Sequence, residues 1–488
     1  MAPKGNNLTT RKELTMNCKR FTCISITILT FLFLLSGYAV SATKSAKKPV
    51  AVKSQKVVEK PIYLQDLSTV DVSDIEVKAH NWVNNGYGVR WSPDGSYVVF
   101  CRPNDGFYVM DPLCQNIRDI GKGMFFEGMS PDGSILYGSR SMDGSFKENI
   151  PAKGLFAINL KDSKVKQIGD FEFSTSKWSP NGKFVAIELS TGEWAIVNIH
   201  SGKTNTLRKE LGGILANIYL PWERRWSLDG NKFLYDAYWE VFVFDANKNT
   251  TNIITKGSDC GWIGNTNKIW ARTPDKKNIA VMNSDGTESN IIESSYVYFS
   301  PLGSWAIART NGLKEVAIKI ADKKTIELIE SEKSGISKGI YPIWFPNENK
   351  FLFPYKLDAN YLNTPCSWYI FSLNTAEGLT TQSNMKFLGS EENPWLCPSL
   401  SPNSRLISFI TNKSSDEVSN TFDLGISDDN AEKHNILAKM NIKDLDWTYS
   451  HVTPQVWSPL GNAIAYSGYT FRDSGIVGVV ILGKKDKK

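Results

Sequence analysis

The sequence has 488 residues, of which 41% are apolar and 12% are aromatic, and its formal net charge is +6. Residues 1–42 hold five Lys or Arg and one Glu, so the remaining chain carries 51 basic against 49 acidic side chains, or +2. This balance excludes the basic footprint of a nucleic-acid-binding protein, and we expect no nucleic-acid partner.

The N-terminal segment predicts export. Residues 21–42 contain no charged side chain, follow Lys19 and Arg20, and end on Val40-Ser41-Ala42. That pattern is typical of a signal peptide over residues 1–42. An uncleaved membrane anchor is the alternative, because about 20 apolar residues suffice to cross a bilayer. Either alternative places the body of the chain in the periplasm or outside the cell, with a membrane tether in the second case.

The next segment, residues 43–60, carries six Lys and one Glu without a pattern of core residues. This composition predicts a solvated basic linker. Adhesion to an anionic membrane surface is the alternative interpretation of such a stretch beside an apolar segment.

A short motif recurs along the rest of the chain, with successive copies 36 to 57 residues apart. It combines a large apolar residue with Ser-Pro-Asp-Gly or a variant of it. The copies begin at Trp91, Met129, Trp178, Trp226, Phe299, Trp344, Leu400 and Trp457, with a degenerate one at Trp262. Self-similarity at such a period is typical of propellers and solenoids.

Each copy predicts a hairpin in a four-stranded antiparallel blade. Pro presets φ at the first turn position, and Asp or Asn followed by Gly supplies the left-handed residues that a hairpin needs. The following strands are rich in β-branched and aromatic residues, as in Tyr97–Phe100 and Trp239–Phe244. One blade cannot bury both of its faces, so the blades must stack around an axis, with the leading aromatic residue packed between them.

The predicted fold is therefore all-β: a single β-propeller over residues 61–488. Eight blades are expected, within a range of seven to nine, because propellers usually close with four to eight blades. Pro61–Leu64 is expected to add the outer strand of the last blade, since little chain follows Gly475–Leu482. Such a clasp would remove an open sheet edge.

Five cysteines follow the export segment: Cys101, Cys114, Cys260, Cys366 and Cys397. An odd number leaves at least one unpaired in an oxidising compartment. Bridges between Cys101 and Cys114, or between Cys366 and Cys397, stay open as alternatives. The spacings match no zinc-ligand pattern, and we expect neither a metal nor another cofactor.

The Trp-Ser-Pro-Asp-Gly hairpins resemble the repeats of TolB-like periplasmic β-propellers and of the propeller in the prolyl oligopeptidase family. The resemblance spans roughly residues 80–485 and implies a fold rather than an activity, because the motif is a folding turn. The repeats leave no room for a separate hydrolase domain. Gly335–Gly339 matches the letters of a nucleophile elbow but lacks its setting between a buried strand and a helix.

The candidate site lies on one rim of the propeller, where the loops between second and third strands and the connections between blades are long. Loops on a rigid scaffold often carry function, and Trp, Tyr and Arg dominate binding energies. The candidate binding residues are Trp222, Arg224, Tyr361, Trp395, Trp447, Tyr449 and His451. For Trp222, Trp395 and Trp447, packing between blades or in the channel is the alternative.

These features predict an exported, non-catalytic propeller that binds a protein or glycan partner on its long-loop rim. The alternative is a propeller enzyme acting on polysaccharide, a lyase or a hydrolase, with Asp446 and His451 as first candidates. Propeller lyases of uronate oligosaccharides use histidine-rich metal centres, as the resemblance implies. The four histidines here, His80, His200, His434 and His451, are scattered along the sequence.

Overall fold

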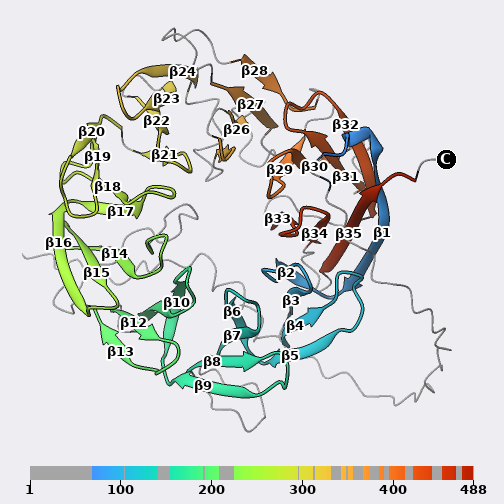
Figure 1. Cartoon of the computed structure of the whole chain (residues 1–488), viewed down its shortest axis with the longest axis horizontal. Helices are drawn as coiled ribbons and strands as arrows, with labels where there is room; N and C mark the ends of the chain where they lie inside the picture. Colours follow the sequence, from blue (N-terminus) through green and yellow to red (C-terminus); the bar gives the residue numbers. More distant parts are fainter. Residues whose placement is uncertain are drawn as a thin grey trace, which may run out of the picture. The chain divides into compact units, whose positions relative to one another are not determined.

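The computed structural model arranges nine antiparallel sheets as the blades of one propeller (Figure 1). The residues that it describes are 67, 69–103, 105–140, 154–190, 193–207, 225–294, 296–310, 314–330, 342–347, 350–355, 367–373, 384–389, 395–412, 421–441, 453–468 and 475–486. All of them belong to one compact unit, Tyr63–Lys488. Within them, no helix is long and apolar enough to span a bilayer. The predicted export segment and basic linker lie outside the described residues.

Blades 1 to 3 each have four strands, which follow the chain from the axis outward. Blade 1 contains β2 (Tyr87–Trp91), β3 (Val98–Arg102), β4 (Gly106–Met110) and β5 (Arg118–Lys122). Blade 2 contains β6 (Phe125–Met129), β7 (Ile135–Arg140), β8 (Gly154–Asn159) and β9 (Val165–Gly169). Blade 3 contains β10 (Phe173–Trp178), β11 (Phe184–Leu189), β12 (Trp194–Asn198) and β13 (Thr204–Thr206).

Blades 4 to 6 include the one three-stranded sheet of the described residues. Blade 4 contains β14 (Lys232–Ala237), β15 (Glu240–Asp245) and β16 (Thr250–Lys256). Blade 5 contains β17 (Ser258–Trp262), β18 (Lys268–Arg272), β19 (Ile279–Asn283) and β20 (Asn290–Ile292). Blade 6 contains β21 (Val297–Phe299), β22 (Trp305–Arg309), β23 (Lys314–Lys319) and β24 (Thr325–Glu330).

Blades 7 to 9 complete the ring. A 3₁₀ turn, η2 (Val72–Asp74), lies near the start of the described residues and directly precedes β1, which belongs to blade 9. Blade 7 contains β25 (Ile343–Trp344), β26 (Lys350–Tyr355), β27 (Ser367–Ser372) and β28 (Asn384–Phe387). Blade 8 contains β29 (Leu396–Leu400), β30 (Leu406–Asn412), β31 (Thr421–Asp428) and β32 (His434–Asn441). Blade 9 contains β33 (Thr453–Trp457), β34 (Ala463–Gly468), β35 (Ile476–Lys484) and β1 (Ile75–Asn84).

Nine blades form the upper end of the predicted range of seven to nine. The blade in excess of the expected eight is blade 5, whose degenerate motif copy at Trp262 lacks Ser and Pro although the full sheet β17–β20 forms. In blade 4 the innermost strand is reduced to a single bridge between Trp226 and Phe233. A blade can therefore form when its motif copy lacks the Ser and Pro residues, or when the described part of its inner strand makes a single bridge.

The motif forms the turn between the first and second strands of a blade, as predicted. In blade 1 the buried Ser92 hydroxyl donates to Asp94 Oδ1 at 2.7 Å and accepts from the Tyr97 backbone N–H at 3.0 Å. The Gly95 N–H donates to the Ser92 carbonyl, and Gly95 has a φ of 73°, a left-handed value that suits glycine. The carboxylate and hydroxyl thus replace water as partners of the turn backbone.

Neighbouring turns also pack on one another. A Cβ atom on Gly133 would lie 3.0 Å from Pro93 Cδ of the preceding blade, and one on Gly182 would lie 2.4 Å from Pro131 Cδ. Across the closure of the ring, a Cβ on Gly95 would lie 3.3 Å from Leu460. The glycines are therefore required for close approach between blades as well as for backbone conformation.

Four of the leading tryptophans are hydrogen-bonded to the blade before their own. Their indole N–H groups donate to the carbonyl of the residue just before the preceding blade's motif copy: Trp91 to Val456 at 2.8 Å, Trp226 to Lys177 at 2.8 Å, Trp262 to Arg225 at 3.1 Å and Trp457 to Ser399 at 3.2 Å. In the described residues, nine hydrophobic clusters each combine side chains of two adjacent blades. The predicted packing of the aromatic residue between blades is confirmed.

The ring closes through the N-terminal strand. β1 pairs antiparallel with β35, from Ile75 opposite Lys484 to Asn84 opposite Ile476, and supplies the outer strand of blade 9. A clasp was predicted, but the strand that provides it is Ile75–Asn84, and Pro61–Leu64 lies outside the described residues. Cys114 contacts the Asn81 carbonyl of β1 and is not bridged to Cys101; Cys366 lies outside the described residues.

His80, on the clasp strand, makes stability depend on pH. Its Nε2 lies 2.7 Å from the Tyr466 hydroxyl, and burial lowers the pKa of His80 below its ordinary value of 6.5. The unfolded chain therefore binds a proton more readily than the folded chain, so this contribution is full above pH 6.5 and falls as the pH drops through the folded pKa. We expect the free energy of unfolding of His80→Gln, measured with urea, to fall less between pH 7 and pH 5 than that of the wild type. His200→Gln, at an exposed turn, should match the wild type, and identical pH slopes for all three proteins would contradict the assignment.

Candidate functional site

The two rims of the propeller differ in the length of their connections. One rim carries the motif turns and the turns between third and fourth strands, and we call it the turn rim. Apart from 373–383, no connection on the turn rim is longer than seven residues. We call the other the loop rim, because second-to-third-strand loops and connections between blades begin and end there. Its connections longer than six residues are 141–153, 207–224, 331–342, 356–366, 388–395, 413–420, 442–452 and 469–475. Six of these eight follow residue 330, so they concentrate between blades 6 and 9.

Of the seven predicted binding residues, the structure describes one. Trp222 and Arg224 fall in connection 207–224, Tyr361 in 356–366, and Trp447, Tyr449 and His451 in 442–452, all outside the described residues. The structure therefore neither brings these six together nor separates them.

Trp395, the seventh, is buried at 5% exposure between blades 7 and 8. Its ring stacks on Phe409 with a centroid distance of 3.8 Å and an interplanar angle of 1°. Its backbone N–H donates to the Leu388 carbonyl at 3.1 Å. Trp395 is therefore packed between blades, which was the alternative to a binding role.

The described histidines all lie on or beside outer strands. His80 is on β1, His434 begins β32 against the ring of Trp395, and the exposed His200 is in the turn before β13. Asp446 and His451, the candidates for an enzymatic alternative, lie outside the described residues. Among the residues that the structure describes, no group of three or more His, Cys, Asp or Glu side chains is placed to hold a metal ion.

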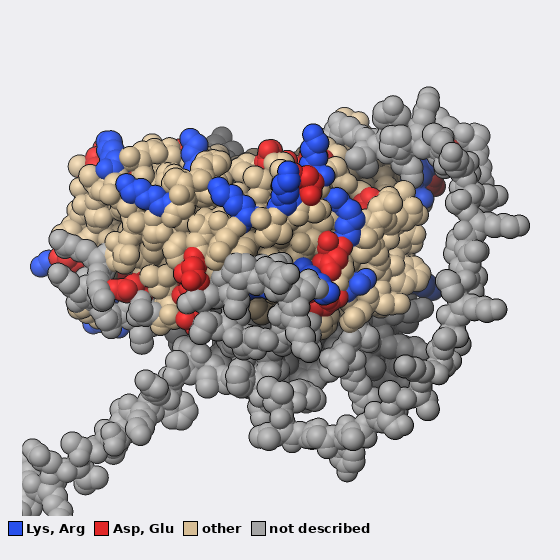
Figure 2. All heavy atoms as spheres, turned by 90° about the horizontal axis from the view of Figure 1, so that it is seen from below, with Lys and Arg blue, Asp and Glu red and all other residues tan. Residues whose placement is uncertain are grey.

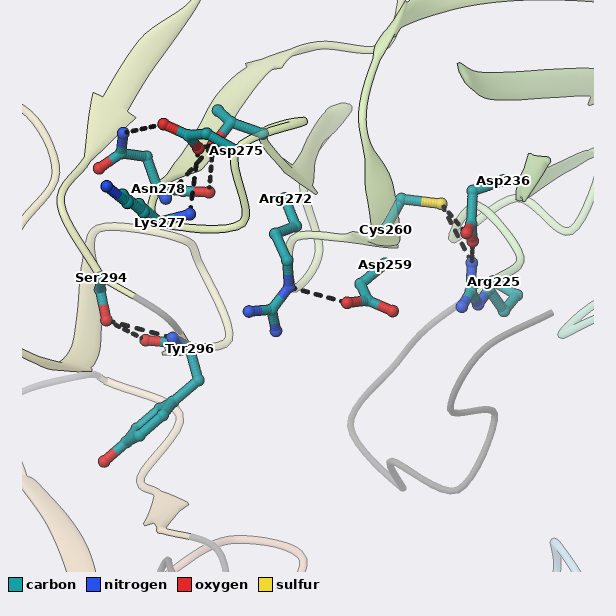
Figure 3. A network of polar contacts seen from close by, with 11 residues as sticks. Arg225, Asp236, Asp259, Cys260, Arg272, Asp275, Lys277, Asn278, Ser294 and Tyr296 are labelled. Atoms are coloured by element: carbon teal, nitrogen blue, oxygen red, sulfur yellow. Dashed lines mark hydrogen bonds and ion pairs between the residues drawn. The ribbon is translucent and has the colours of Figure 1, made fainter. Parts of the chain in front are cut away.

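Beneath the loop rim of blades 4 and 5 lies a buried polar network (Figure 3). Arg225, which follows connection 207–224, places Nη1 3.1 Å from Asp236 Oδ1 and 3.0 Å from the Cys260 sulfur. The Arg225 and Asp236 side chains are only 6% and 9% exposed. The Arg225 carbonyl also accepts the indole N–H of Trp262 and the backbone N–H of Leu234. Arg225 therefore fixes the point at which this connection enters blade 4.

One further ion pair and one hydrogen-bonded turn lie on the same rim. Arg272, at the end of β18, donates from Nε to Asp259 Oδ2 at 2.7 Å (Figure 3). In the loop that follows, Asp275 accepts the Thr273 hydroxyl at 2.5 Å and the Lys277 backbone N–H at 3.0 Å. These contacts fix the end of β18 and the shape of the loop that follows it.

Blade 6 repeats the arrangement around Glu315, whose side chain is fully buried. Its Oε1 accepts from Arg309 Nη2 at 2.8 Å, and the Tyr296 hydroxyl donates to the same carboxylate. Burial and the nearby Glu315 charge raise the pKa of Tyr296, which stays protonated as a donor. Burial acts to lower the pKa of Arg309, but its contacts with Glu315 outweigh that effect and raise it. The connection into blade 6 is thereby tied to the ends of β22 and β23.

One exposed turn of the loop rim was placed wrongly from the sequence. Trp239 was predicted to begin a strand, but β14 and β15 are joined by a two-residue turn, Tyr238–Trp239, with both side chains about half exposed. The aromatic run without Gly, Asn or Pro hid the turn. Its one sequence signal is that Lys232–Phe244 is too long for a single strand of this propeller.

The side of the ring shows charged groups of both signs. In Figure 2, Lys and Arg are interspersed with Asp and Glu over a largely uncharged surface. This mixture on the visible face agrees with the near balance of charge after residue 42.

No family model and no curated protein matches the chain. Solved structures do resemble it. The crystal structure of a eukaryotic initiation factor is 13% identical with a TM-score of 0.43, covering 80% of this chain and 84% of that one. The C-terminal WD40 domain of Sif2 is 12% identical with a TM-score of 0.43, covering 84% and 99%. An oligogalacturonate lyase in complex with manganese is 12% identical with a TM-score of 0.39, covering 84% and 98%.

These neighbours include both a WD40 domain and an enzyme, and at such low identity the likeness concerns the fold alone. The chain is a nine-bladed, all-β propeller, and the comparisons leave its activity open.

Proposed function

We propose that this chain is an exported, non-catalytic β-propeller, TolB-like in its repeats, that binds a protein or glycan partner on its loop rim. The single observation that supports this function is the separation of connection lengths. Eight connections longer than six residues begin and end on one rim, whereas the opposite rim consists almost entirely of short turns. A rigid scaffold with its variable chain on one side is the usual arrangement of a binding protein.

The described residues supply the rigidity that such a site needs. Tryptophan hydrogen bonds join successive inner strands, and buried ion pairs fix the strand ends at the loop rim. Preorganised strand ends reduce the ordering entropy that binding must overcome. In this proposal Trp222, Arg224, Tyr361, Trp447, Tyr449 and His451 contact the partner, and Trp395 supports them from within the core.

Site-specific photo-crosslinking tests the rim assignment. A benzophenone amino acid is introduced singly at Trp222, Tyr361 and Trp447, and the protein is irradiated in its native host. We expect discrete adducts from these positions, because the partner lies on the loop rim. Matched controls use exposed residues of the turn rim, and those positions should give none: Leu228, Leu302 and Leu460, which are 55%, 54% and 49% exposed.

Adducts from the turn rim alone, or equal yields from both rims, would overturn the proposal. Catalytic turnover would also overturn it, and this is tested with purified protein on uronate and neutral oligosaccharides, with and without added divalent metal.

A further inference from the structure

The Tyr238–Trp239 turn is unusual in its backbone. Ala237 and Glu240 are paired across the hairpin, so only these two residues make the turn, and their φ values are 48° and 62°. Positive φ at both central positions defines the tight hairpin turn that strongly favours Asn-Gly. Side chains as bulky as Tyr and Trp carry a steric penalty there, and such strain concentrates at ligand clamps and binding sites.

The surrounding strands hold this conformation in place. The Trp239 carbonyl accepts the Gly257 backbone N–H at 2.7 Å. Gly257 has a φ of 156°, and a Cβ atom there would lie 2.3 Å from the Arg272 carbonyl oxygen. Arg272 is itself held by Asp259 at 2.7 Å. The backbone of the turn is therefore held in place, while both side chains are about half exposed.

The two rings are exposed although the chain buries most of its tryptophans. Tyr238 and Trp239 are 48% and 49% exposed, compared with 4% for Trp226 in the same blade. The exposed Lys276, from the adjacent loop of blade 5, places Nζ 4.7 Å from the centroid of the Trp239 ring. Lys276 also has a positive φ, 60°. Two neighbouring loops thus adopt strained conformations that bring an ammonium group beside an exposed indole ring.

We propose that the Tyr238–Trp239 turn is an anchor that inserts into an apolar pocket of a protein partner whose carboxylates pair with Lys276. The tip of a two-residue hairpin is convex, and small sugars and cofactors are usually bound in concave sites. Rigid Tyr and Trp side chains that fill a partner's pocket are typical centres of protein interfaces. The inference rests on the proposed function and specifies its partner class.

A first experiment separates binding from folding. The double change Tyr238→Asn and Trp239→Gly installs the residues that this turn favours, so the midpoint of thermal unfolding should rise by roughly 2–4 °C. A lower midpoint would show that the aromatic rings stabilise the fold, and it would overturn the proposal. Ile253→Asn is the matched control, because Ile253 is an exposed apolar residue of the same blade, at 55% exposure.

A second experiment uses defined probes. The full-length protein is panned against a phage-displayed peptide library, with counter-selection on the Tyr238→Asn/Trp239→Gly variant, and a glycan array is screened in parallel. We expect peptides that combine apolar or aromatic residues with Asp or Glu, bound at least about tenfold more weakly by Lys276→Glu and by the double variant. Ile253→Asn should bind them like the wild type.

Peptides that bind both proteins equally, or that lack acidic residues, would overturn the anchor. Variant-sensitive binding confined to the glycan array would overturn the protein class of the partner. If crosslinking from Trp222, Tyr361 and Trp447 persists in the double variant at full yield, the loop-rim function stands and this inference alone fails.

Discussion

Replacing Trp226 with alanine is expected to lower the free energy of unfolding by about 3–5 kcal/mol. The ring is 4% exposed between blades 3 and 4, where it lies parallel to Phe184 and 5.1 Å from Phe233 between centroids. Its removal opens a cavity at the blade whose inner strand is reduced to one bridge. It also leaves the Lys177 carbonyl without the indole donor at 2.8 Å. Urea unfolding followed by circular dichroism measures the loss.

Two variants separate the contributions of packing and hydrogen bonding. Trp226→Phe keeps an aromatic ring but deletes the N–H group, so it should cost about 1–3 kcal/mol for the unsatisfied carbonyl and the smaller ring. Trp82→Ala removes an indole that is 57% exposed and should change stability by less than about 1 kcal/mol. Equal losses at Trp82 and Trp226 would contradict the assignment of Trp226 as a link between blades.

Arg309→Ala is expected to destabilise the protein by about 3–5 kcal/mol. Glu315 has no exposed surface, and Arg309 is its cationic partner at 2.8 Å. Without the guanidinium, the carboxylate is buried with only the Tyr296 hydroxyl and any backbone groups to stabilise it. The loss is therefore the cost of an uncompensated buried charge, and chemical denaturation of the purified variant measures it.

A rescue experiment identifies the cause. Combining Arg309→Met with Glu315→Leu and Tyr296→Phe removes the whole polar group, and it should recover most of the lost stability, because apolar residues can replace a buried ion pair. Lys314→Ala is the matched control: Lys314 lies 2.8 Å from Glu327, but the two side chains are 48% and 69% exposed, so the change should cost no more than about 1 kcal/mol. If Lys314→Ala costs as much as Arg309→Ala, burial is not the deciding factor.

The fold could be predicted because its turn chemistry is local. In Ser92-Pro93-Asp94-Gly95, the serine, carboxylate and glycine each satisfy a need of the turn itself, so the pattern survives in the sequence of every clear repeat. The inter-blade role of Trp91 and Trp457 also follows, since a repeated large aromatic residue must be buried by a neighbour. Even after the degenerate copy at Trp262, the residue pattern indicated the two strands that follow it, β18 and β19.

Features that depend on distant partners could not be predicted in the same way. The clasp strand Ile75–Asn84 mixes polar with apolar residues, and only its pairing with β35 makes it a strand. The Tyr238–Trp239 turn lacks the Asn and Gly residues that a turn of this backbone conformation favours. It is held by a hydrogen bond from Gly257, which lies between β16 of blade 4 and β17 of blade 5. Sequence could not distinguish a packed Trp395 from an exposed one, because its burial depends on Phe409 in an adjacent strand.

The pairing of β1 with β35 has a consequence for biosynthesis. The strand Ile75–Asn84 is made roughly 400 residues before its partner Ile476–Lys484. At about 5–20 residues per second, the interval between them lasts roughly 20–80 s. During that time the nascent chain cannot complete the sheet of blade 9, because β35 joins β1 to β34; removal of Ile476–Lys484 would leave β1 unpaired and β34 with an open edge.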